Sequence, residues 1–596
     1  MAFKRLLMKS ISGFLSALTL SFLLFLSSCA DRNNVKLTLI QTTDLHGVIL
    51  PYDYIEKEPL RASLANSATY IRHIREAGES VVLLDNGDNL QGQPSVYYYN
   101  FIDTVSPHIL SEAMNWLDFD ATTVGNHDIE AGHNVYDRLS EEYDFPMLAA
   151  NAVNKITGNP YFTPYVIIER DGIRMAILGL ITPAVPSWLP EELFSGIEFR
   201  DMVETARLWM PEIMKQKPDL VAGLFHSGWN REDYEEVKGK GPVENGSAAV
   251  AYNVPGFDII FCGHDHRIAN EKFANALGDT ILILNGGSRS EMLARADIQF
   301  AGNRLTGLKV KSVSGTLINV KDYEPDNEFI EKFRSYDEAL REYVDMVIGT
   351  CTSTISSRDA YFGSSAFVDM IHKIQMKISG AGISFAAPLS FDVSIQKGPV
   401  TVGDMFKLYR FENMLYTMEL TGLEIRNYLE YSYSEWLNTM KNESDYLLKL
   451  RLGKDGKPIL VNGEVWLRNQ SYNFDSAAGI DYVVDASAPD GQKVTIRGLS
   501  TGDGFYENRT YSVALNSYRG NGGGSHLTRG AGIKTEDLMS RVTASTDKDL
   551  RYYIMKEIES MGTIRPVKLN NWKIIPEEWV EKATQREYRL LFSSDR

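Results

Sequence analysis

The histidines of this 596-residue chain are concentrated in its first half, where they stand beside acidic and amide residues. Eight of the ten histidines precede position 267. Five of these eight lie in short polar blocks, whose members are Asp44 and His46; Asp88; Asn126, His127 and Asp128; His226; and His264 and His266. Neutral imidazoles and carboxylates are ligands by which proteins hold divalent metals. The blocks therefore predict a metal centre, whereas His73, His108 and His133 lie outside them and are interpreted as ordinary structural residues.

Two divalent cations held close together need a bridging carboxylate, several imidazoles and room for a water between them. Asp88 is the natural bridge. Asp44 and His46 are two residues apart, and so are His264 and His266. In an extended segment, side chains spaced in this way point in the same direction. We therefore expect each pair to lie in an extended segment and to present both of its groups to the metals.

Five apolar, β-branched runs come directly before the polar blocks. They span residues 35–40, 80–84, 121–124, 220–225 and 258–261. Such runs, alternating with amphipathic stretches, are typical of the strands of a layered α/β domain. In these folds, functional loops gather outside the carboxyl ends of the strands. The elements therefore predict that polar blocks distant in the sequence form one site.

In their order along the chain, the blocks D-x-H, G-D, G-N-H-D, H and G-H-x-H resemble those of the calcineurin-like metallophosphoesterases. The resemblance implies an N-terminal domain of four layers, α/β/β/α, that binds two divalent metal ions (Mn²⁺, Zn²⁺ or Co²⁺). It implies that one metal binds Asp44, His46, Asp88 and His266, and that the other binds Asp88, Asn126, His226 and His264. It also implies that His127 is a catalytic side chain oriented by Asp128.

The same resemblance implies hydrolysis of a phosphoester. A hydroxide that bridges the two metals would attack phosphorus in line, because a bound divalent cation lowers the pKa of water to around 7. His127 would stabilise or protonate the departing oxygen. Asn151 follows another predicted strand, and it is either a further substrate contact or an ordinary turn asparagine.

The C-terminal half resembles the α+β substrate-binding domain of the two-domain nucleotidase branch of this superfamily. Segments 386–388, 472–475 and 516–519 are closest to the group of 2′,3′-cyclic-nucleotide 2′-phosphodiesterases/3′-nucleotidases. The resemblance implies that Tyr472 and Tyr518 hold a nucleobase between their rings, because aromatic stacking tolerates every base. Three glycines at 522–524 would leave the face of Tyr518 accessible. Arg519, beside Tyr518, is a further candidate substrate contact.

Residues 388–391 depart from the 5′-nucleotidases of this branch, which carry Gly-Gly-x-Arg there. The missing arginine favours cyclic or 3′-phosphates as substrates. Arg410 and Arg519 could substitute for it, so 5′-nucleotidase or UDP-sugar hydrolase activity is the alternative. A third hypothesis is a nucleotide-binding lipoprotein that has lost catalysis, and the complete ligand set argues against it. Residues 285–290 also depart from the family pattern, which predicts altered surroundings for the metal ligands.

The composition is that of a folded protein with more than one domain. Hydrophobic residues make up 44% of the chain and charged residues 23%, which excludes a largely disordered protein. The net charge of −17 argues against a sequence-independent grip on DNA or RNA. Metals at a carboxylate cluster can still make a site attractive to phosphate. We expect a small-molecule nucleotide as the substrate, no nucleic-acid polymer as a partner, and a monomer.

Residues 1–28 have the pattern of a secretory signal. Lys4, Arg5 and Lys9 precede an apolar stretch at 11–26, which is too short to span a bilayer comfortably. This stretch ends in the sequence L-S-S-C, which resembles a bacterial lipobox and places its cysteine at Cys29. We therefore expect an exported protein of the bacterial periplasm or cell surface, tethered to a membrane through lipidated Cys29.

The domain layout follows from the remaining patterns. Only Cys262 and Cys351 come after Cys29, so a disulfide framework is not expected. Cys262 is interpreted as a small buried residue at a strand end. Apolar residues spaced three or four apart at 326–348 predict one long helix. We expect this helix to join a catalytic domain at 29–325 to a substrate-binding domain at 349–596.

Overall fold

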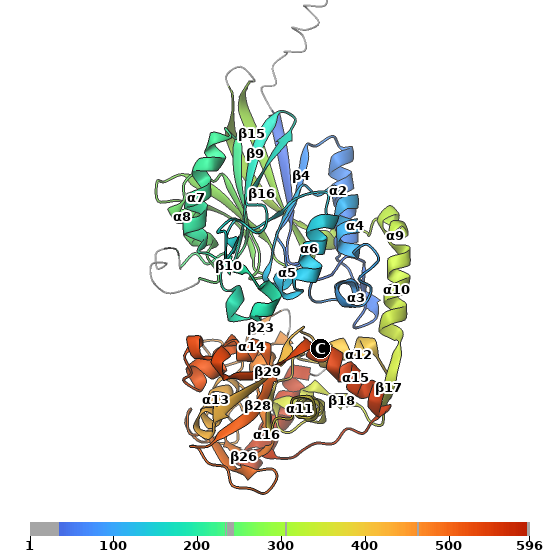
Figure 1. Cartoon of the computed structure of the whole chain (residues 1–596), viewed down its shortest axis with the longest axis vertical. Helices are drawn as coiled ribbons and strands as arrows, with labels where there is room; N and C mark the ends of the chain where they lie inside the picture. The colour runs from blue at the N-terminus through green and yellow to red at the C-terminus, as the bar shows by residue number, and fades with distance from the viewer. Residues whose placement is uncertain (1–34, 233, 235–242, 304–306, 462–463, 593–596) are drawn as a thin grey trace, which may run out of the picture.

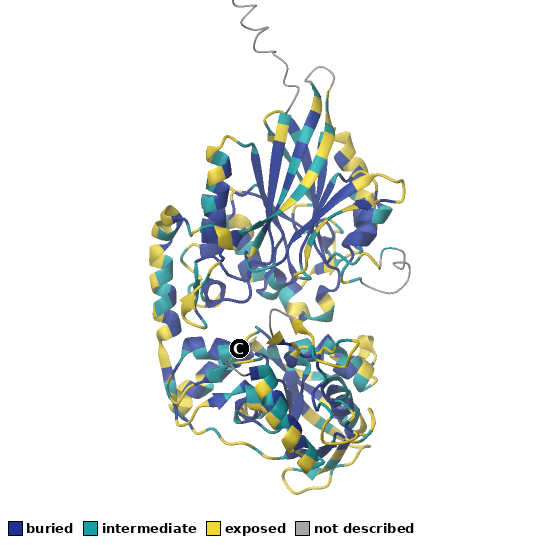
Figure 2. Cartoon of the chain, turned by 180° about the vertical axis from the view of Figure 1, so that it is seen from behind, coloured by how far each residue is buried: buried dark blue, intermediate teal, exposed yellow. Residues whose placement is uncertain are grey.

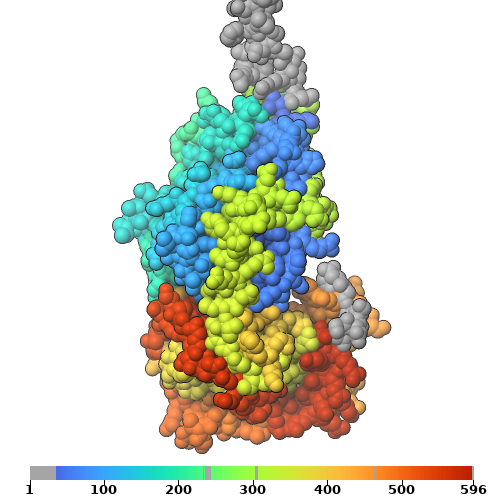
Figure 3. Space-filling view, turned by 90° about the vertical axis from the view of Figure 1, so that its right-hand side faces the viewer, coloured from blue at the N-terminus to red at the C-terminus, as the bar shows by residue number. Residues whose placement is uncertain are grey.

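The computed structural model describes residues 35–232, 234, 243–303, 307–461 and 464–592. The chain forms two domains stacked along its longest axis, and two helices run down one side to connect them (Figure 1, Figure 3). The expected signal segment 1–28 and Cys29 lie outside the described residues. Within the described ranges, no helix is long and apolar enough to cross a membrane.

The N-terminal domain is built on two six-stranded sheets. The first has the order β16 (Gly307–Asn319), β15 (Met292–Asn303), β1 (Val35–Thr42), β4 (Val81–Asp85), β5 (Ala121–Thr123) and β6 (Met147–Leu148). The second has the order β13 (Ile268–Ala274), β14 (Thr280–Gly286), β12 (Ile259–Cys262), β11 (Leu220–His226), β9 (Ile173–Ile181) and β8 (Tyr165–Arg170). Strands β1, β4 and β5 are parallel, as are β9, β11 and β12, so each set ends at one edge of its sheet.

The two sheets pack face to face and are covered by helices on their outer sides. Buried apolar residues between the sheets include Leu39, Leu84, Ile177 and Leu224. Helices α2 (Leu64–Glu76), α4 (Ile109–Trp116) and α6 (His133–Glu142) cover the first sheet, and α7 (Met202–Lys215) and α8 (Ser247–Asn253) cover the second. Most strands of this domain are therefore buried on both faces (Figure 2). The predicted α/β/β/α layering is confirmed, and all five predicted strands are present.

The connection between the domains differs from the single long helix predicted for 326–348. It consists of α9 (Asn327–Lys332) and α10 (Arg334–Asp345), which are separated at Phe333 (φ −99°, ψ 13°). Phe333 is fully buried and its ring lies 4.6 Å from that of Phe329, so the apolar stripe continues across the break. The helix ends before Val347 because β17 (Val347–Cys351) pairs with β21 (Gly398–Thr401) and β30 (Thr563–Ile564).

The C-terminal domain is an α+β unit, as the resemblance implies. Its main sheet has the order β25 (Ser476–Ala478), β19 (Ile383–Ala386), β28 (Thr510–Asn516), β22 (Met414–Thr421) and β29 (Val542–Asp549). A smaller sheet has the order β27 (Val494–Leu499), β26 (Ile480–Asp485) and β31 (Trp572–Ile575). The principal helices are α11 (Ala366–Ser379), α12 (Val402–Leu408), α13 (Gly422–Trp436), α15 (Leu550–Met561) and α16 (Glu577–Phe592). Its core includes a group of packed aromatic residues, in which Trp436 stacks on Phe474 at 4.9 Å.

The carboxyl ends of the strands in the N-terminal domain face the C-terminal domain. Helix α5 (Asn126–Glu130), which follows β5, lies at this edge (Figure 1). Tyr97 of α3 (Pro94–Phe101) packs edge-on against Phe406 of α12 at 5.3 Å. Its hydroxyl donates a hydrogen bond to Asp549 at 3.0 Å. The polar blocks are thus placed between the two domains.

Candidate metal centre and active site

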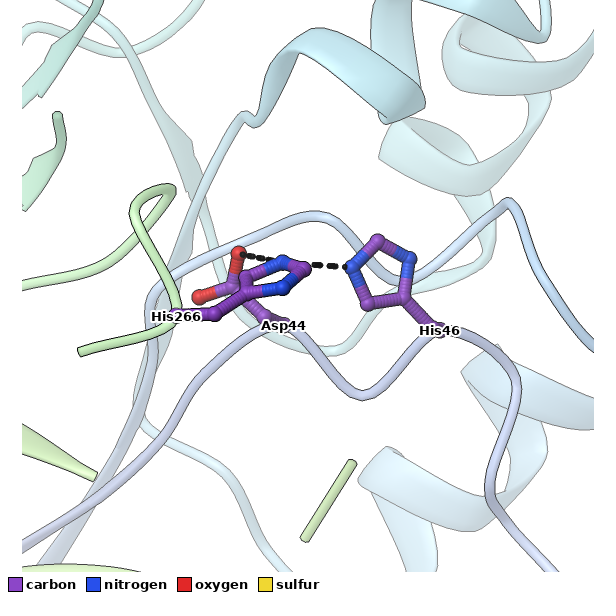
Figure 4. Close-up of side chains that lie close together, drawn as sticks. All are labelled: Asp44, His46 and His266. Carbon is purple, nitrogen blue, oxygen red and sulfur yellow. Dashed lines mark hydrogen bonds and ion pairs between the residues drawn. The ribbon is translucent and has the colours of Figure 1, made fainter. Parts of the chain in front are cut away.

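Two groups of side chains converge at the edge of the sheets that faces the C-terminal domain. In each group the candidate ligand atoms lie within 4.8 Å of one another. Asp44, His46 and His266 form the first group, which Figure 4 shows. There, Nε2 of His266 lies 3.0 Å from Nε2 of His46 and 3.4 Å from Oδ1 of Asp44.

Asp88, His226 and His264 form the second group. His226 Nε2 lies 3.1 Å from Asp88 Oδ2 and 3.2 Å from Asn126 Oδ1. The groups adjoin, because the backbone N–H of His264 donates to both carboxylate oxygens of Asp44 at 3.1 Å. The structure therefore brings together all seven residues that were expected to be ligands.

The candidate ligands lie on tight turns, and the expectation of extended segments is wrong. Five of them have a left-handed backbone, with positive φ: Asp44 (49°), His46 (48°), Asp88 (56°), His264 (74°) and His266 (55°). Hydrogen bonds hold two of these turns, because the N–H of Asp44 donates to Gly87 O at 2.9 Å and that of His46 donates to Asp88 O at 3.1 Å. A residue with a side chain costs on the order of 1 to 3 kcal/mol in such a conformation, which is why these conformations gather at functional sites.

Backbone carbonyls fix the tautomers of two histidines so that their lone pairs face the centre. Nδ1 of His46 lies 3.0 Å from Gln91 O, and Nδ1 of His226 lies 2.6 Å from Asn86 O. A carbonyl oxygen only accepts, so each Nδ1 carries the proton and each Nε2 is free to act as a ligand. Nε2 of His226 then faces two oxygens that also only accept. A divalent cation satisfies this set of converging acceptors, so the residues fit the expected metals.

The electrostatics of the centre also favour a positive charge. Asp44 and Asp88 are fully buried, and burial alone would raise the pKa of each carboxyl. The surrounding histidines reverse this effect and lower both pKa values below the ordinary range. Conversely, Asp88 overcomes the effect of burial on His226 and raises its pKa to about 9. Without a metal the site takes up protons, which bound cations would displace.

His127 lies beside the candidate metal ligands and belongs to neither of the two groups. Its backbone N–H donates to Asp88 Oδ1 at 2.8 Å, and its ring lies 5.4 Å from that of His46. Nδ1 lies 2.5 Å from Oε2 of Glu130, one helical turn further along α5. Burial lowers the pKa of His127, but the carboxylates of Asp88 and Glu130 outweigh it and raise the pKa to about 10. His127 is therefore protonated at neutral pH in the metal-free site.

Asp128 does not orient His127, so that prediction is wrong. Its carboxylate accepts hydrogen bonds from four backbone N–H groups, those of Asp88, Asn89, Leu90 and Gly125, at 2.7 to 3.2 Å. Asp128 thus caps α5 and shapes the loop that carries Asp88. Burial and the nearby charge of Asp88 raise the pKa of Asp128 to about 7. Glu130 takes the orienting role, and the i, i+3 spacing from His127 was the sequence signal for it.

The side chain of Asn151 bonds to neighbouring backbone and to none of the candidate metal ligands. It is fully buried, and its side-chain amide donates to Ile181 O at 2.7 Å and to Arg200 O at 2.9 Å. Its side-chain oxygen accepts from the N–H of Ile181 at 2.9 Å. Every one of these partners is backbone, so the structure supports the turn interpretation over a substrate contact.

The two tyrosines proposed to hold a base lie on separate loops of the C-terminal domain. Tyr472 belongs to a 3₁₀ turn at Ser471–Asn473, and Tyr518 to the short helix α14 (Ser517–Gly520); both are partly exposed. The α14 loop reaches the N-terminal domain, where Asn521 donates to Trp188 O at 3.1 Å. The ring of Trp188 lies 5.5 Å from that of His264. The α14 loop therefore adjoins the second candidate metal group. Trp188 contacts both Asn521 and His264, and no sequence pattern pointed to it.

Two arginines approach each other from opposite domains near the first metal group. Arg289 lies in the departing segment 285–290; its N–H donates to Asp44 O at 2.8 Å, and its guanidinium pairs with Asp53 at 3.6 Å. Arg410 of the C-terminal domain is exposed. Although the residue as a whole is exposed, protein atoms surround its guanidinium, and this desolvation together with the positive charge of Arg289 lowers the pKa of Arg410. Two like charges that face each other favour an anion between them.

Comparison with known proteins finds a match to a described family in each half of the chain. Residues 37–267 match the calcineurin-like phosphoesterase family, and residues 347–529 match the 5′-nucleotidase C-terminal domain. The 2′,3′-cyclic-nucleotide 2′-phosphodiesterase/3′-nucleotidase of Yersinia enterocolitica is 27% identical, over 96% of this chain and 92% of the relative. That of Haemophilus influenzae is 26% identical, over 91% of this chain and 88% of the relative.

The solved structures show a similar architecture. The crystal structure of the 5′-nucleotidase precursor from Thermus thermophilus covers 91% of this chain and 100% of its own, with a TM-score of 0.60 and 19% identity. At this identity the similarity concerns the fold. It supports the arrangement of a four-layer domain followed by an α+β domain.

Proposed function

We propose that this chain, a calcineurin-like metallophosphoesterase with a 5′-nucleotidase C-terminal domain, is a metal-dependent 2′,3′-cyclic-nucleotide 2′-phosphodiesterase/3′-nucleotidase. The observation that carries the proposal is the convergence of two ligand groups next to the loops of Tyr472 and Tyr518. One half of this arrangement suits a phosphate, and the other suits a base.

Two divalent cations held by these groups would activate a water for attack on phosphorus and polarise the phosphoryl oxygens. The choice of cation is also a proposal: the imidazole-rich ligand sets suit Mn²⁺, Zn²⁺ or Co²⁺. Elemental analysis of the purified protein tests it, with two such ions per chain as the expected content. A content below one per chain would instead support a binding protein that has lost catalysis.

The residues of the chain divide the remaining work between them. Protonated His127 is positioned to donate to the departing oxygen, and Glu130 holds its ring through Nδ1 so that Nε2 is the free end. The buried side chain of Asn126 places its amide oxygen beside Nε2 of His226, where it would be an oxygen ligand of the second group. Tyr472 and Tyr518 would bind the base by stacking, which contributes on the order of 1 to 3 kcal/mol per base.

The missing arginine at 388–391 supports a preference for cyclic and 3′-phosphates. Phe391 of this segment turns inward, with its ring 5.3 Å from that of Tyr361 and 5.2 Å from that of Phe592. This segment therefore presents no cation to a 5′-phosphate. A 5′-nucleotidase is the second candidate, because Arg410 lies on the same domain and close enough to Arg289 to be affected by its charge.

The test is phosphate release by the Mn²⁺-loaded protein from 2′,3′-cyclic AMP, 3′-AMP, 5′-AMP and a nucleotide sugar. We expect the first two to be preferred, and His127→Ala to lose most activity on every substrate while its metal content is kept. Preference for 5′-AMP would favour the second candidate. No release from any of the four substrates would contradict a nucleotidase function.

Export and lipid anchoring form a separate part of the proposal. They are supported by the basic, apolar and L-S-S-C pattern of residues 1–29. Growth with a labelled fatty acid is expected to label the wild-type protein in the membrane fraction. Cys29→Ser should abolish the label, and equal labelling of the two proteins would contradict the proposed anchor.

A further inference from the structure

The guanidinium of Arg519 has no donor left for a substrate. Its side chain is 2% exposed. Its Nε donates to Asp475 at 2.8 Å, and one terminal nitrogen donates to Asn473 Oδ1 and Gly523 O, both at 3.0 Å. The other terminal nitrogen donates to Tyr472 O at 2.7 Å and to Asp475 at 3.3 Å. An arginine has five N–H donors, so these five bonds account for all of them.

These acceptors lie on both of the loops that carry the proposed base-binding tyrosines. Asn473, Asp475 and the carbonyl of Tyr472 belong to one loop, and the carbonyl of Gly523 belongs to the loop of Tyr518. Arg519 itself follows Tyr518 directly, and its guanidinium carbon lies 5.4 Å from the centre of the Tyr518 ring. The planar guanidinium of Arg519, called the Arg519 fork below, thus links the two loops through its hydrogen bonds.

The glycines of the second loop leave room for this arrangement. A Cβ at position 523 would lie 2.5 Å from Cε2 of Tyr518, so the ring rests directly on the glycine backbone. A Cβ at position 524 would lie 2.2 Å from a terminal nitrogen of Arg519, and Gly524 has a φ of 68°. Both positions therefore require glycine, one beneath the ring and the other beneath the guanidinium.

Burial and charge keep the fork in one geometry. Asp475 is 3% exposed and also accepts a hydrogen bond from the hydroxyl of Tyr428, which is fully buried. Burial raises the pKa of Asp475, but the charge of Arg519 outweighs it and lowers the pKa below its ordinary value. Two opposite charges paired in this way lose their partners if either moves, so the loops are held to a single spacing.

We propose that Arg519 is a positioning residue that sets the separation of Tyr472 and Tyr518 and thereby the affinity for the base of a nucleotide. The proposal rests on the proposed nucleotidase function. It replaces the expectation that Arg519 contacts substrate. The phosphate-binding side of the site does not depend on it.

The experiment compares 3′-AMP with glycerol 2-phosphate, a phosphomonoester without a base, on the full-length, Mn²⁺-loaded protein. Arg519→Lys keeps the positive charge and removes the fork. We expect it to raise the KM for 3′-AMP about 10-fold, within the range that base stacking contributes, with kcat unchanged within about twofold. The kcat/KM for glycerol 2-phosphate should stay at the wild-type value. The dissociation constant of adenosine, measured by calorimetry, should rise by the same factor as KM.

Two further variants keep the test decisive. Asn473→Ala removes one of the five acceptors, so it should raise the KM for 3′-AMP by a smaller factor and serves if Arg519→Lys does not fold. Arg509→Lys makes the matched substitution at an exposed arginine of the same domain and should change neither substrate. An equal fall in kcat/KM for both substrates would show that Arg519 acts on the phosphate, and an unchanged KM would show that it does not position the tyrosines. A wild-type protein without preference for 3′-AMP over glycerol 2-phosphate would instead count against the proposed function itself.

Discussion

The charge of His127 is set by the carboxylates around it. Glu130 lies 2.5 Å from Nδ1, and Asp88 accepts the backbone N–H of His127 at 2.8 Å. Together they raise the pKa of His127 to about 10 against the opposing effect of burial. In the metal-free site an imidazolium with this pKa keeps its proton throughout the physiological range, and a protonated imidazole suits a group that donates to a departing oxygen.

Glu130→Gln is expected to move the alkaline limb of the pH profile of kcat/KM to lower pH. Removing one negative charge destabilises the imidazolium, so the pKa of His127 falls. An adjacent opposite charge shifts a pKa by about 1 to 3 units, and we expect at least about one unit here. Activity that needs the protonated form is lost above that pKa, so the loss begins at lower pH in the variant. The measurement is the rate of 3′-AMP hydrolysis as a function of pH with metals held at saturation.

Glu141→Gln provides the control for this experiment, because it removes the same charge from an exposed position on α6. Its alkaline limb should match that of the wild type. If Glu130→Gln also matches the wild type, His127 does not supply the proton, or Glu130 does not set its pKa.

Residue types and their order were sufficient to predict which side chains converge, but not the local backbone geometry that brings them together. Asp88 and His226 could be assigned because each stands directly after or at the end of an apolar run, where parallel strands deliver loops to one edge. The left-handed turns at Asp44 and His46 depend on hydrogen bonds to the β4 loop, which lies about forty positions away and leaves no local pattern. Arg519 was misassigned for a related reason, since its acceptors come from a loop near position 473.

Among the elements, the turn between β5 and α5 is the most tightly constrained. Gly125 precedes α5, and a Cβ there would lie 2.1 Å from Oδ1 of Asp88 and 2.4 Å from its backbone nitrogen. The β4 and β5 loops thus meet through a glycine. Asp128 fastens the same junction by accepting the N–H groups of both Asp88 and Gly125.

Gly125→Ala is expected to displace Asp88 and weaken metal binding without unfolding the domain. Changes that disturb the groups supporting a ligand typically cost about 10- to 100-fold in metal affinity or activity, and we expect a loss at the upper end of this range. The measurement is metal content after dialysis against a limiting concentration of Mn²⁺, together with circular dichroism. Gly363→Ala is the matched control, because a Cβ at position 363 meets no atom within 4 Å. Two metals per chain in Gly125→Ala would contradict the expectation that the close approach of Gly125 to Asp88 is needed for metal binding.

The same elements show how far the fold could be predicted. The apolar run at 220–225 could be predicted as a strand because both faces of its sheet are covered, which makes its sequence continuously hydrophobic. The helix predicted for 326–348 was divided at Phe333 and shortened at Val347. The apolar spacing of residues 326–348 correctly predicted that Phe333 is buried. It could not predict the end of the helix, which depends on the pairing of β17 with β21 and β30.

At the scale of the whole molecule, the candidate metals would add a link between parts that packing and hydrogen bonds already hold together. Asp44, Asp88 and Asn126 follow strands of the first sheet, whereas His226 and His264 belong to the second. Tyr97 and Phe406 extend a shared core into the C-terminal domain. A cation bound to residues from both sheets would therefore stabilise the four-layer domain directly and the contact between the domains indirectly.

Removal of the metals is expected to lower the stability of the N-terminal domain selectively. A ligand that binds only the folded state stabilises it by about 2.7 kcal/mol at a concentration 100-fold above its Kd. In a domain of this size each kcal/mol shifts Tm by about 2 to 4 °C, so chelation should lower the first thermal transition by about 5 °C or more. Differential scanning calorimetry measures the shift, and hydrogen exchange should localise the loss of protection to the loops after β1, β4, β5, β11 and β12. Asp88→Asn removes the expected bridging carboxylate, so its transitions with and without chelator should nearly coincide. An equal response to chelator in Asp88→Asn and the wild type would place the stabilising metal somewhere other than this centre.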